Sequence, residues 1–534
     1  MAAVRQRCQL RSSMVGALAR TSRPSSAAPT SFLCRNDQRR TITTKQLDID
    51  KKGRERVLVL GSGWAGYSLS RNLDPAKYQV VVVVSPRSYF VFTPLLASTC
   101  VGTLEFRTAL EPVRSRRLNA AFFQGWADDI DFDKKTLTVE ESVADNFQGL
   151  ALTGDRHPQS QSERKEEKAV ESAKGELFDI SYDKLVVAVG CYSQTFNTPG
   201  VKENALFLKD VGDARKIRKR ILECFETAAL PTTSETQRKQ LLNFAVVGGG
   251  PTGIEFSAEL HDLIKDDLSK VYPYSAQAFK ITVYDVAPKV LSMFDDKLAD
   301  YAMNHFKRQG IEIKTSHHVQ NLRKGVPSAL KDSPEIKDPS TGLTMTVKEE
   351  GEIGTGMVVW STGLMMNPFV ERALKQTRKF PSKSVASHAS VPEGVDWTIK
   401  HDFKTGGLLT DDKLRVKLLA KTGEDEAPET VLKDVFALGD CAVLEGTMYP
   451  ATAQVANQKA EWLAKRLNKG DIESQAFTWK NMGVMAYVGN WNAIMQGGKR
   501  GPDVSGRAAW VIWRGAYLAK SVSWRNRILI PAYW

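Results

Sequence analysis

Two copies of one glycine pattern constrain the fold of this chain more than any other feature. In the first copy the apolar run Val57–Leu60 predicts a short buried strand, and Tyr67–Asn72 predicts the start of a helix. The glycines between them, in G-x-G-x-x-G spacing, are Gly61, Gly63 and Gly66. The first permits a tight turn, the second lets the backbone approach a pyrophosphate, and the third lets helix and strand pack closely. The free N–H groups of the helix N-terminus would then face the phosphate charge.

A single copy can also be an ordinary glycine-rich turn, so the second copy carries much of the weight. Phe244–Val247 is again a short apolar run, and a helix-like run again follows. The glycines in this copy are Gly248, Gly250 and Gly253. Two such patterns fit two dinucleotides bound by one chain, as a flavin enzyme reduced by a nicotinamide requires. We therefore expect an α/β fold with two Rossmann-like dinucleotide-binding domains.

The net charge of +13 is concentrated at the two ends of the chain. Residues 1–45 hold nine basic residues and one acidic residue, and residues 476–534 hold eight basic residues and one acidic residue. The body between them is close to neutral, which argues against a nucleic-acid binder. A length of 534 residues, with 42% hydrophobic and 25% charged residues, allows a large core and two or three domains.

The basic segment 1–45 is rich in Arg, Ser, Thr and Ala. This composition predicts a mitochondrial transit peptide, cleaved near Arg39–Lys45, with a merely disordered basic arm as the alternative. No run in the sequence approaches the 18 or so apolar residues that are needed to span a bilayer.

The cysteines form no C-x-x-C pair; they are Cys8, Cys34, Cys100, Cys191, Cys224 and Cys441. A disulfide scaffold, a zinc ribbon and a vicinal redox dithiol are therefore unsupported, and we expect no metal site. Cys191 and Cys441 stand next to glycine motifs, and we expect both to serve packing.

The first unit departs from the usual pattern at its second strand, Tyr78–Val84. Such a strand normally ends on an acid for the ribose hydroxyls, but here the residue is Ser85. Further along, Asn146–Lys174 is polar and predicts an exposed or disordered insertion. Gly212–Leu230 follows a helical pattern, and Pro231–Arg238 resembles a linker before the second unit.

The second unit does supply an acid, since its second strand, Ile281–Tyr284, ends on Asp285. A carboxylate there can accept from both ribose hydroxyls and would repel a 2′-phosphate, which favours NADH over NADPH. An ordinary surface aspartate is the alternative. Val358–Gly363 closes this unit, Val435–Asp440 predicts a strand ending in Gly-Asp, and Tyr449–Lys469 predicts a helix.

The C-terminal segment 476–534 is basic and aromatic. A single helix over Arg507–Arg527 would carry its rings on one face, namely Trp510, Trp513, Tyr517 and Trp524, flanked by Arg507, Arg514 and Lys520. Such a helix can lie in a membrane interface, with its rings among the headgroups and its basic side chains on anionic lipid. A helix packed on its own core or on a second subunit is the alternative.

Taken together, the motifs resemble those of the type II NADH dehydrogenases, most closely the fungal mitochondrial members. They are GSGWAG at 61–66, SPRSYFVFTPLLAS at 85–98, GGGPTGIE at 248–255, ALGDCA at 437–442 and ATAQVANQKAEWLAK at 451–465. The resemblance covers most of 55–534 and implies an FAD domain interrupted by an NADH domain. We expect the domains at 1–45 (transit peptide), 55–235 and 400–475 (FAD), 241–375 (NADH) and 476–534 (membrane anchoring and dimerisation).

The resemblance also implies the roles of individual residues. Glu255 would lie near the nicotinamide, Gln454 and Gln458 would line a quinone site, and Asp440 would accept from the flavin ribityl chain. Further cofactor-binding residues would be Gly61, Ser62, Gly63, Trp64, Gly66, Ser85, Arg87, Thr93, Pro94, Leu95, Gly248, Gly250, Pro251, Thr252, Gly253, Asp285, Gly363, Gly439 and Ala453.

The activity implied is hydride transfer from NADH to a non-covalent FAD, and then two-electron reduction of ubiquinone without proton pumping. The protein would be a homodimer on the anionic lipid surface of the mitochondrial inner membrane, on the matrix side. Two alternatives stay open at this point. One is a signalling flavoprotein similar to apoptosis-inducing factor, and the other is a soluble NADH-dependent reductase with a protein partner.

Overall fold

The computed structural model describes residues 51–533, except 116–117, 119, 143–175, 337, 381–384, 386–395, 422–426 and 499–500. The predicted transit peptide at 1–45 and the whole predicted polar insertion at 146–174 therefore lie outside the described residues. The described chain belongs to one compact unit that begins at Thr44.

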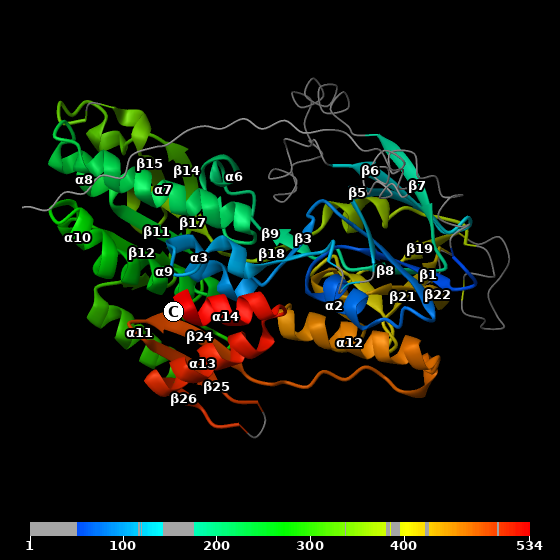
Figure 1. Ribbon diagram of the computed structural model, residues 1–534. Helices are drawn as coiled ribbons and strands as arrows, with labels where there is room; N and C mark the ends of the chain where they lie inside the picture. Colours follow the sequence, from blue (N-terminus) through cyan, green and yellow to red (C-terminus); the bar gives the residue numbers. More distant parts are fainter. Residues whose placement is uncertain are drawn as a thin grey trace, which may run out of the picture. The chain divides into compact units, whose positions relative to one another are not determined.

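A mixed sheet with a parallel centre carries the first glycine loop (Figure 1). Its parallel strands, in spatial order, are β22 (Glu429–Ala437), β8 (Lys184–Val187), β1 (Glu55–Leu60), β2 (Tyr78–Ser85) and β5 (Ala121–Asp131). Antiparallel strands extend the sheet beyond β5, namely β6 (Thr136–Glu141) and β7 (Leu177–Ser181). Beyond β22 it is extended by β19 (Trp397–Ile399), β20 (Leu408–Thr410), β21 (Arg415–Ala420) and β23 (Ala442–Leu444).

The first strand–turn–helix unit has the backbone that its glycines predict. Val57–Leu60 is fully buried, as expected where parallel strands are covered on both faces. Gly61 has φ +106°, and a Cβ on it would lie 2.2 Å from the Ala188 carbonyl oxygen. A Cβ on Gly66 would lie 2.1 Å from the Gly61 oxygen, so α2 (Trp64–Asn72) packs on the turn only because both residues are glycine.

The second glycine loop belongs to a separate parallel sheet, which lies to the left of the first in Figure 1. Its strands, in spatial order, are β10 (Leu206–Phe207), β17 (Met357–Trp360), β11 (Asn243–Val247), β12 (Lys280–Tyr284) and β13 (Glu312–Lys314). Helix α9 (Pro251–Leu263) follows the glycine loop. Gly248 has φ +115°, and a Cβ on Gly253 would lie 2.0 Å from the Gly248 oxygen, so the geometry of the first loop is repeated.

The chain passes between the two sheets along a pair of short strands. It leaves the first sheet through β9 (Cys191–Ser193) and returns through β18 (Leu364–Met366), and these two strands pair antiparallel. The first sheet is completed only afterwards by β20–β22. One dinucleotide-type unit is therefore inserted into another, which confirms the expected fold class.

Three predicted elements have different bounds. The linker expected at 231–238 was wrong in its second half, because α8 (Glu235–Leu241) begins there and is capped by Ser234, whose Oγ accepts from the Gln237 N–H at 3.2 Å. The helix expected from Tyr449 begins only at α12 (Ala453–Lys469), after its Thr452 cap. Strand β22 ends at Ala437, and Gly439–Cys441 forms a 3-10 turn.

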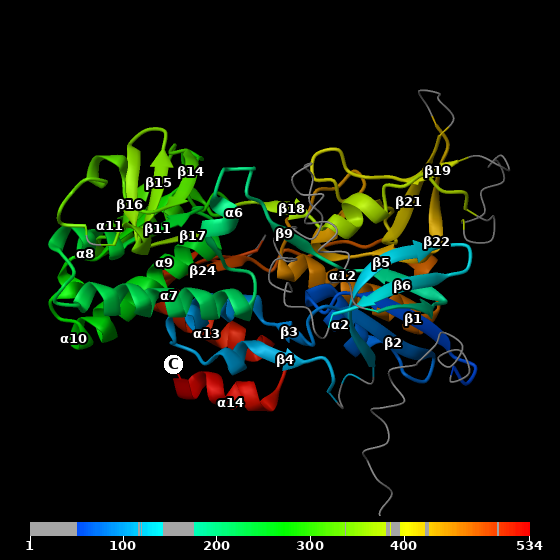
Figure 2. The ribbon, with the colours of Figure 1, turned by 90° about the horizontal axis from the view of Figure 1, so that it is seen from above.

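The C-terminal segment differs most from its prediction. It forms a small sheet, β24 (Val484–Gly489), β25 (Asn492–Gln496) and β26 (Val504–Gly506), followed by α13 (Arg507–Lys520) and α14 (Trp524–Tyr533). Both helices are red in Figures 1 and 2. The single helix expected over 507–527 is wrong, because the chain leaves helical geometry at Ser521.

The single aromatic face is wrong as well. Trp513 is only 3% exposed and packs on the protein's own core, whereas Trp524 on the next helix is 66% exposed. In the described part of the chain no helix is both long and apolar enough to cross a bilayer.

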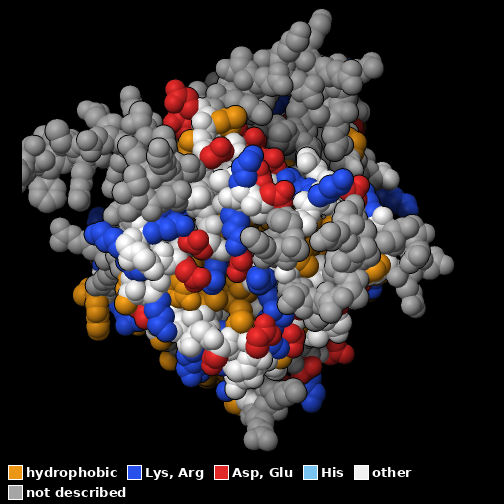
Figure 3. Space-filling view, turned by 90° about the vertical axis from the view of Figure 1, so that its right-hand side faces the viewer, with side chains coloured by type: hydrophobic (Ala, Val, Ile, Leu, Met, Phe, Trp, Pro, Cys, Tyr) orange, Lys and Arg blue, Asp and Glu red, His pale blue; other side chains and the backbone are white. Residues whose placement is uncertain are grey.

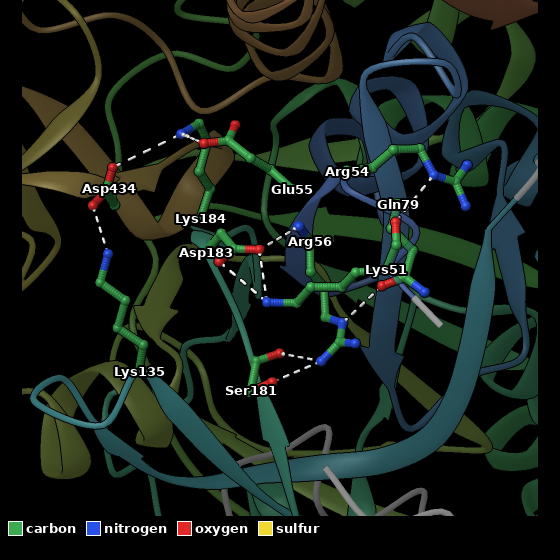
Figure 4. A network of polar contacts seen from close by, with 10 residues as sticks. All are labelled: Lys51, Arg54, Glu55, Arg56, Gln79, Lys135, Ser181, Asp183, Lys184 and Asp434. Carbon is green, nitrogen blue, oxygen red and sulfur yellow. Dashed lines mark hydrogen bonds and ion pairs between the residues drawn. The ribbon is translucent and has the colours of Figure 1, made fainter. Parts of the chain in front are cut away.

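A polar network fastens the first sheet at the end opposite the glycine loop (Figure 4). The buried Arg56 guanidinium donates to Ser181 Oγ at 2.7 Å and to Gln79 Oε1 at 3.1 Å, while its backbone N–H donates to Asp183 Oδ2 at 2.6 Å. Lys135 pairs with Asp434 at 2.7 Å. The network thus joins β1, β2, β7, β8 and β22, which holds the strands in register beneath the site.

The surface over this sheet carries both signs of charge. In Figure 3, Lys and Arg side chains alternate with Asp and Glu, and no single-sign patch covers the visible described surface. Lys417, for example, pairs with Glu429 at 2.5 Å. This view agrees with the near-neutral charge of the central part of the sequence.

Candidate active site

A cavity opens at the carboxyl ends of β1, β2, β8 and β22, where ligands bind in sheets of this kind. Residues from eight separate stretches of the chain line it. The predicted cofactor residues among them are Gly61, Ser62, Gly63, Trp64, Ser85, Arg87, Thr93, Gly439, Asp440 and Ala453. Gly66 lies beneath the turn, and Leu95 is fully buried behind Thr93. Pro94, between them, does not line the cavity and belongs to the 3-10 turn Thr93–Leu95.

Ser85 stands at the position where an acid was expected, and its hydroxyl binds other protein groups. Its Oγ lies 2.9 Å from Ser62 Oγ and accepts from the Arg87 N–H at 3.2 Å. Ser62 also donates toward the Tyr89 carbonyl oxygen at 3.1 Å. Both serines are at most 5% exposed. The pair therefore fixes the glycine loop to the end of β2, a task that two small hydroxyls perform without a buried charge.

Arg87 is held in the cavity wall by Asp210, a residue that sequence reasoning missed. The guanidinium lies 3.2 Å from Asp210 Oδ2, and the Tyr89 hydroxyl donates to the same oxygen at 3.3 Å. Asp210 also caps α7 (Val211–Ala229), as Oδ1 accepts from the Val211 N–H at 2.6 Å. The acid just before a helical pattern was a capping signal that could have drawn attention to it.

Cys191 and Lys209 form a second unforeseen group on the wall. The Cys191 thiol donates to Asp440 Oδ2 at 3.3 Å, and Lys209 Nζ donates to Cys191 O at 2.8 Å. Burial raises the pKa of Cys191 to about 12, so the group is a thiol at neutral pH and not a nucleophile. Cys441 is fully buried, and the four described cysteines are all free.

Trp64 secures the loop that follows β3 (Tyr89–Val91). Its indole N–H donates to Thr93 Oγ1 at 3.0 Å, and its ring meets Phe90 edge-on with centroids 5.0 Å apart. Thr93 is thereby placed at the rim of the cavity by a side chain that belongs to the glycine loop itself.

The second glycine loop ends in Gly250, the N-cap of α9, where no side chain caps the helix. Pro251 has no N–H to satisfy, Thr252 is exposed, and a Cβ on Gly250 would meet no atom within 4 Å. The helix N-terminus is therefore open to an anion. Gly363 lies between β17 and β18, and its oxygen accepts from the Gln194 N–H at 3.3 Å.

Asp285 reaches back to the glycine loop. One carboxylate oxygen accepts from the Gly249 N–H and the other accepts from the Ala287 N–H at 2.7 Å. A carboxylate has about four acceptor positions, so two remain for ribose hydroxyls. The structure places the acid where the pattern put it, although the span from Gly248 is longer than usual.

Glu255 points from α9 into the C-terminal segment. It is 9% exposed, and its Oε1 accepts from the Tyr487 N–H at 3.1 Å and from Trp513 Nε1 at 3.3 Å. One turn further, Glu259 accepts from Ser98 Oγ at 2.5 Å and from Thr103 Oγ1 at 2.9 Å. Burial raises the pKa of Glu255 to about 8 and that of Glu259 to about 7.

Gln454 and Gln458 both bind the segment Trp479–Gly483, which crosses α12. Gln454 Oε1 accepts from Trp479 Nε1 and from the Met482 N–H, each at 3.1 Å, and its Nε2 donates to the Gly483 oxygen at 3.2 Å. Gln458 exchanges two hydrogen bonds with the Lys480 backbone, at 2.9 and 3.0 Å. The side-chain amides of Gln454 and Gln458 therefore bind the segment Trp479–Gly483. Their contact with a quinone stays a prediction.

These geometries fit a flavin dinucleotide in the cavity and a nicotinamide dinucleotide at α9. At Gly63 and Gly250 alike a Cβ would stand in open space, so bare backbone faces both places where a pyrophosphate belongs. No group of His, Cys, Asp or Glu that could hold a metal ion occurs among the residues that the structure describes.

Two glycine loops on two parallel sheets, one inserted in the other, define a two-dinucleotide oxidoreductase. A family model described as pyridine nucleotide-disulphide oxidoreductase matches residues 55–379, and one described as NDH2 C-terminal domain matches residues 481–534. A probable NADH dehydrogenase of Dictyostelium discoideum is 35% identical over 90% of this chain and 88% of its own length. The chain belongs to the type II NADH dehydrogenase family.

Other relatives are similar over comparable lengths. External NADH-ubiquinone oxidoreductase 2 of Saccharomyces cerevisiae mitochondria is 34% identical over 90% of this chain and 80% of its own length. Internal alternative NAD(P)H-ubiquinone oxidoreductase A1 of potato mitochondria is 32% identical over 90% and 85%. The solved structure of NDH2 from Plasmodium falciparum in complex with NADH shares the fold, with a TM-score of 0.68 at 22% identity, over 90% of this chain and 97% of that one.

Proposed function

We propose that this protein oxidises NADH with a non-covalently bound FAD and passes two electrons to ubiquinone without pumping protons. The observation that carries the proposal is the joining of both glycine loops to a C-terminal segment of the NDH2 type. That segment reaches the nicotinamide-side helix through Trp513 and Glu255. Relatives named as NADH- or NAD(P)H-ubiquinone oxidoreductases support the same reaction.

When bound, FAD would supply the hydride acceptor and the two-electron donor for the quinone. The residues of this chain bind and orient the reactants. The open N–H groups at Gly63 and Gly250 hold the two pyrophosphates, and Asp285 accepts from the ribose hydroxyls of NADH. Asp440, whose Oδ2 accepts from the Cys191 thiol, would accept from the ribityl hydroxyls of a bound FAD.

Glu255 is the residue that can hold a proton beside the reaction. Its Oε1 already accepts two N–H groups, so a proton belongs on Oε2. With a pKa raised to about 8 by burial, the carboxyl is mostly protonated at neutral pH. It can therefore lie near a reduced nicotinamide without adding a negative charge.

The chain lacks what a disulfide reductase or a sulfide oxidoreductase would need. Its sequence has no C-x-x-C pair, and the cavity-lining Cys191 is a protonated thiol. The signalling alternative finds no support among the relatives, which are named as dehydrogenases and quinone oxidoreductases.

Anaerobic stopped-flow absorbance of the purified protein tests the reaction. NADH should bleach the flavin band quickly, and a short-chain ubiquinone added afterwards should restore it quickly. A reduced flavin that persists in the presence of quinone would contradict the proposal and would favour the signalling flavoprotein.

We also propose a peripheral position on the matrix face of the mitochondrial inner membrane, as a homodimer on anionic lipid. The transit-peptide composition of residues 1–45 and the mitochondrial relatives support the organelle. The relatives include external and internal enzymes, so the face needs its own test. Protease added to mitochondria with a ruptured outer membrane should spare the protein, and digestion would place it on the outer face.

A further inference from the structure

Lys459 is a buried lysine without a counter-ion among the described residues. It lies on α12, is 2% exposed, and its Nζ donates only to the Ala442 carbonyl oxygen, at 3.4 Å. No carboxylate in the described part of the chain lies within ion-pair distance of it. By contrast, Arg87 is partnered by Asp210, Asp440 by the Cys191 thiol, and Lys209 by the carbonyl oxygen and sulfur of Cys191 at 2.8 and 3.1 Å.

The ammonium group stands directly behind the wall of the flavin cavity. Ala453 and Ala456, on the preceding turns of α12, line the cavity, and so do Gly439 and Asp440. Lys459 is one turn beyond Ala456, and it bonds the residue that follows the Gly439–Cys441 turn. Burial keeps the Cys441 thiol neutral by raising its pKa to about 11, so the Asp440 carboxylate is the charge that acts on the lysine. The turn therefore separates the lysine from the cavity by a single layer of protein.

Burying an unpaired ammonium group destabilises the folded protein, so a functional role for the charge would explain its presence. Removing an ammonium from water is unfavourable, and an apolar side chain of similar length, such as methionine, would fill the same space without that cost. Burial lowers the pKa of Lys459, while the Asp440 carboxylate acts in the opposite direction. Titratable groups whose pKa is shifted by burial and by a nearby charge occur preferentially at functional sites.

We propose that Lys459 is a positioning residue that raises the reduction potential of the bound flavin through its positive charge behind the Asp440 turn. The proposal rests on the proposed binding of FAD in this cavity. Reduction adds electrons to the ring system, and the Asp440 carboxylate on the wall disfavours this added negative charge. A cation one layer behind the carboxylate offsets that effect and favours the reduced state.

The test measures the flavin midpoint potential in the FAD-loaded protein by equilibration with a reference dye. Lys459→Met removes the charge and the hydrogen bond, whereas Lys459→Gln keeps a donor for Ala442. Both variants should be harder to reduce, by at least tenfold in the equilibrium constant, which is about 30 mV for a two-electron couple. Lys465→Met, at an exposed position on the same helix, should leave the potential unchanged.

Two outcomes would overturn the proposal. If Lys459→Gln keeps the wild-type potential while Lys459→Met does not, the hydrogen bond to Ala442 matters and the charge does not. If both variants lose FAD, or both hold FAD at the wild-type potential, Lys459 serves the structure alone. Failure of the proposed function would look different, because the unaltered protein would then bind no FAD or would not be reduced by NADH.

Discussion

Asp285 is the residue through which the nicotinamide site can be tested most directly. Asp285→Asn keeps the shape of the side chain but removes the charge that faces the ribose. Charge-assisted hydrogen bonds contribute about 1.5–3 kcal/mol, so we expect the KM for NADH to rise about 10- to 100-fold. Steady-state kinetics with NADH and NADPH measure the effect.

Asp285 also binds the Gly249 N–H, so the variant could lose either recognition of the ribose or support of the glycine loop. The ratio of the KM for NADH to the KM for NADPH distinguishes these two effects. If the carboxylate repels a 2′-phosphate, the KM for NADPH should rise much less than the KM for NADH. An equal loss for both substrates would mean that the residue only holds the glycine loop.

Glu255 gives a prediction of how stability changes with pH. Its pKa is about 8 in the folded protein and about 4.3 in an unfolded chain. The folded state therefore binds the extra proton, and its stability falls as pH rises from about 4 to 8. Glu255→Gln cannot ionise, so at pH 9 it should be more stable than the unaltered protein, by about 5 kcal/mol at most.

Thermal unfolding at pH 5 and pH 9 checks this difference. At pH 5 the Glu255 carboxyl is protonated in the folded protein, so the variant should be nearly as stable as the unaltered protein. A variant that is less stable at both pH values would show that Glu255 is ionised in the fold.

At the scale of elements, the segment Trp479–Gly483 depends on the first turns of α12. Gln454 binds it through three hydrogen bonds. We expect Gln454→Ala to slow quinone reduction about tenfold or more, while flavin reduction by NADH stays within about twofold. This is the cost of one or two lost hydrogen bonds, at about 1 kcal/mol each.

Stopped-flow separates the two half-reactions of this variant. Asn457→Ala is the matched control, since that amide donates to Glu461 on its own helix. Loss of both half-reactions in Gln454→Ala would assign the glutamine to the fold and not to the quinone site.

For the molecule as a whole, the exposed apolar side chains of α14 predict that this helix binds the lipid membrane. Trp524 and Ile528 are 66% and 68% exposed. Burying an isoleucine is worth about 1.5–3 kcal/mol, so Ile528→Asp should weaken binding to anionic liposomes about tenfold or more. Vesicle co-sedimentation measures this, with circular dichroism to verify folding.

Val271→Asp is the control, because Val271 is 65% exposed on a different element. Equal binding by Ile528→Asp and the unaltered protein would mean that α14 does not anchor it. Deleting 507–534 would be a poorer test, since it removes Trp513, a buried partner of Glu255.

Patterns of neighbouring residues were enough to predict both strand–glycine–helix units and the acid at the end of β12, whereas the insertion of one unit in the other was implied only by the family resemblance. The units and the acid are local features. A buried parallel strand needs a continuous apolar run, and Gly61 and Gly248 stand at positive φ, where a side chain would also strike a carbonyl oxygen. Residues adjacent in the sequence are therefore sufficient to specify these features.

The tertiary structure decided what distant segments do to each other. Trp513 was predicted on a membrane-facing stripe, but contacts with Tyr487 and Glu255 bury it. Asp210 and Lys209 belong to no motif, and they line the cavity only because the fold brings their segment to the edge of the sheet. Lys459 does lie in the motif at 451–465, but its burial behind the cavity wall follows only from the packing of α12. Burial, counter-ions and pKa values depend on such long-range packing, and no local pattern in a single sequence contains them.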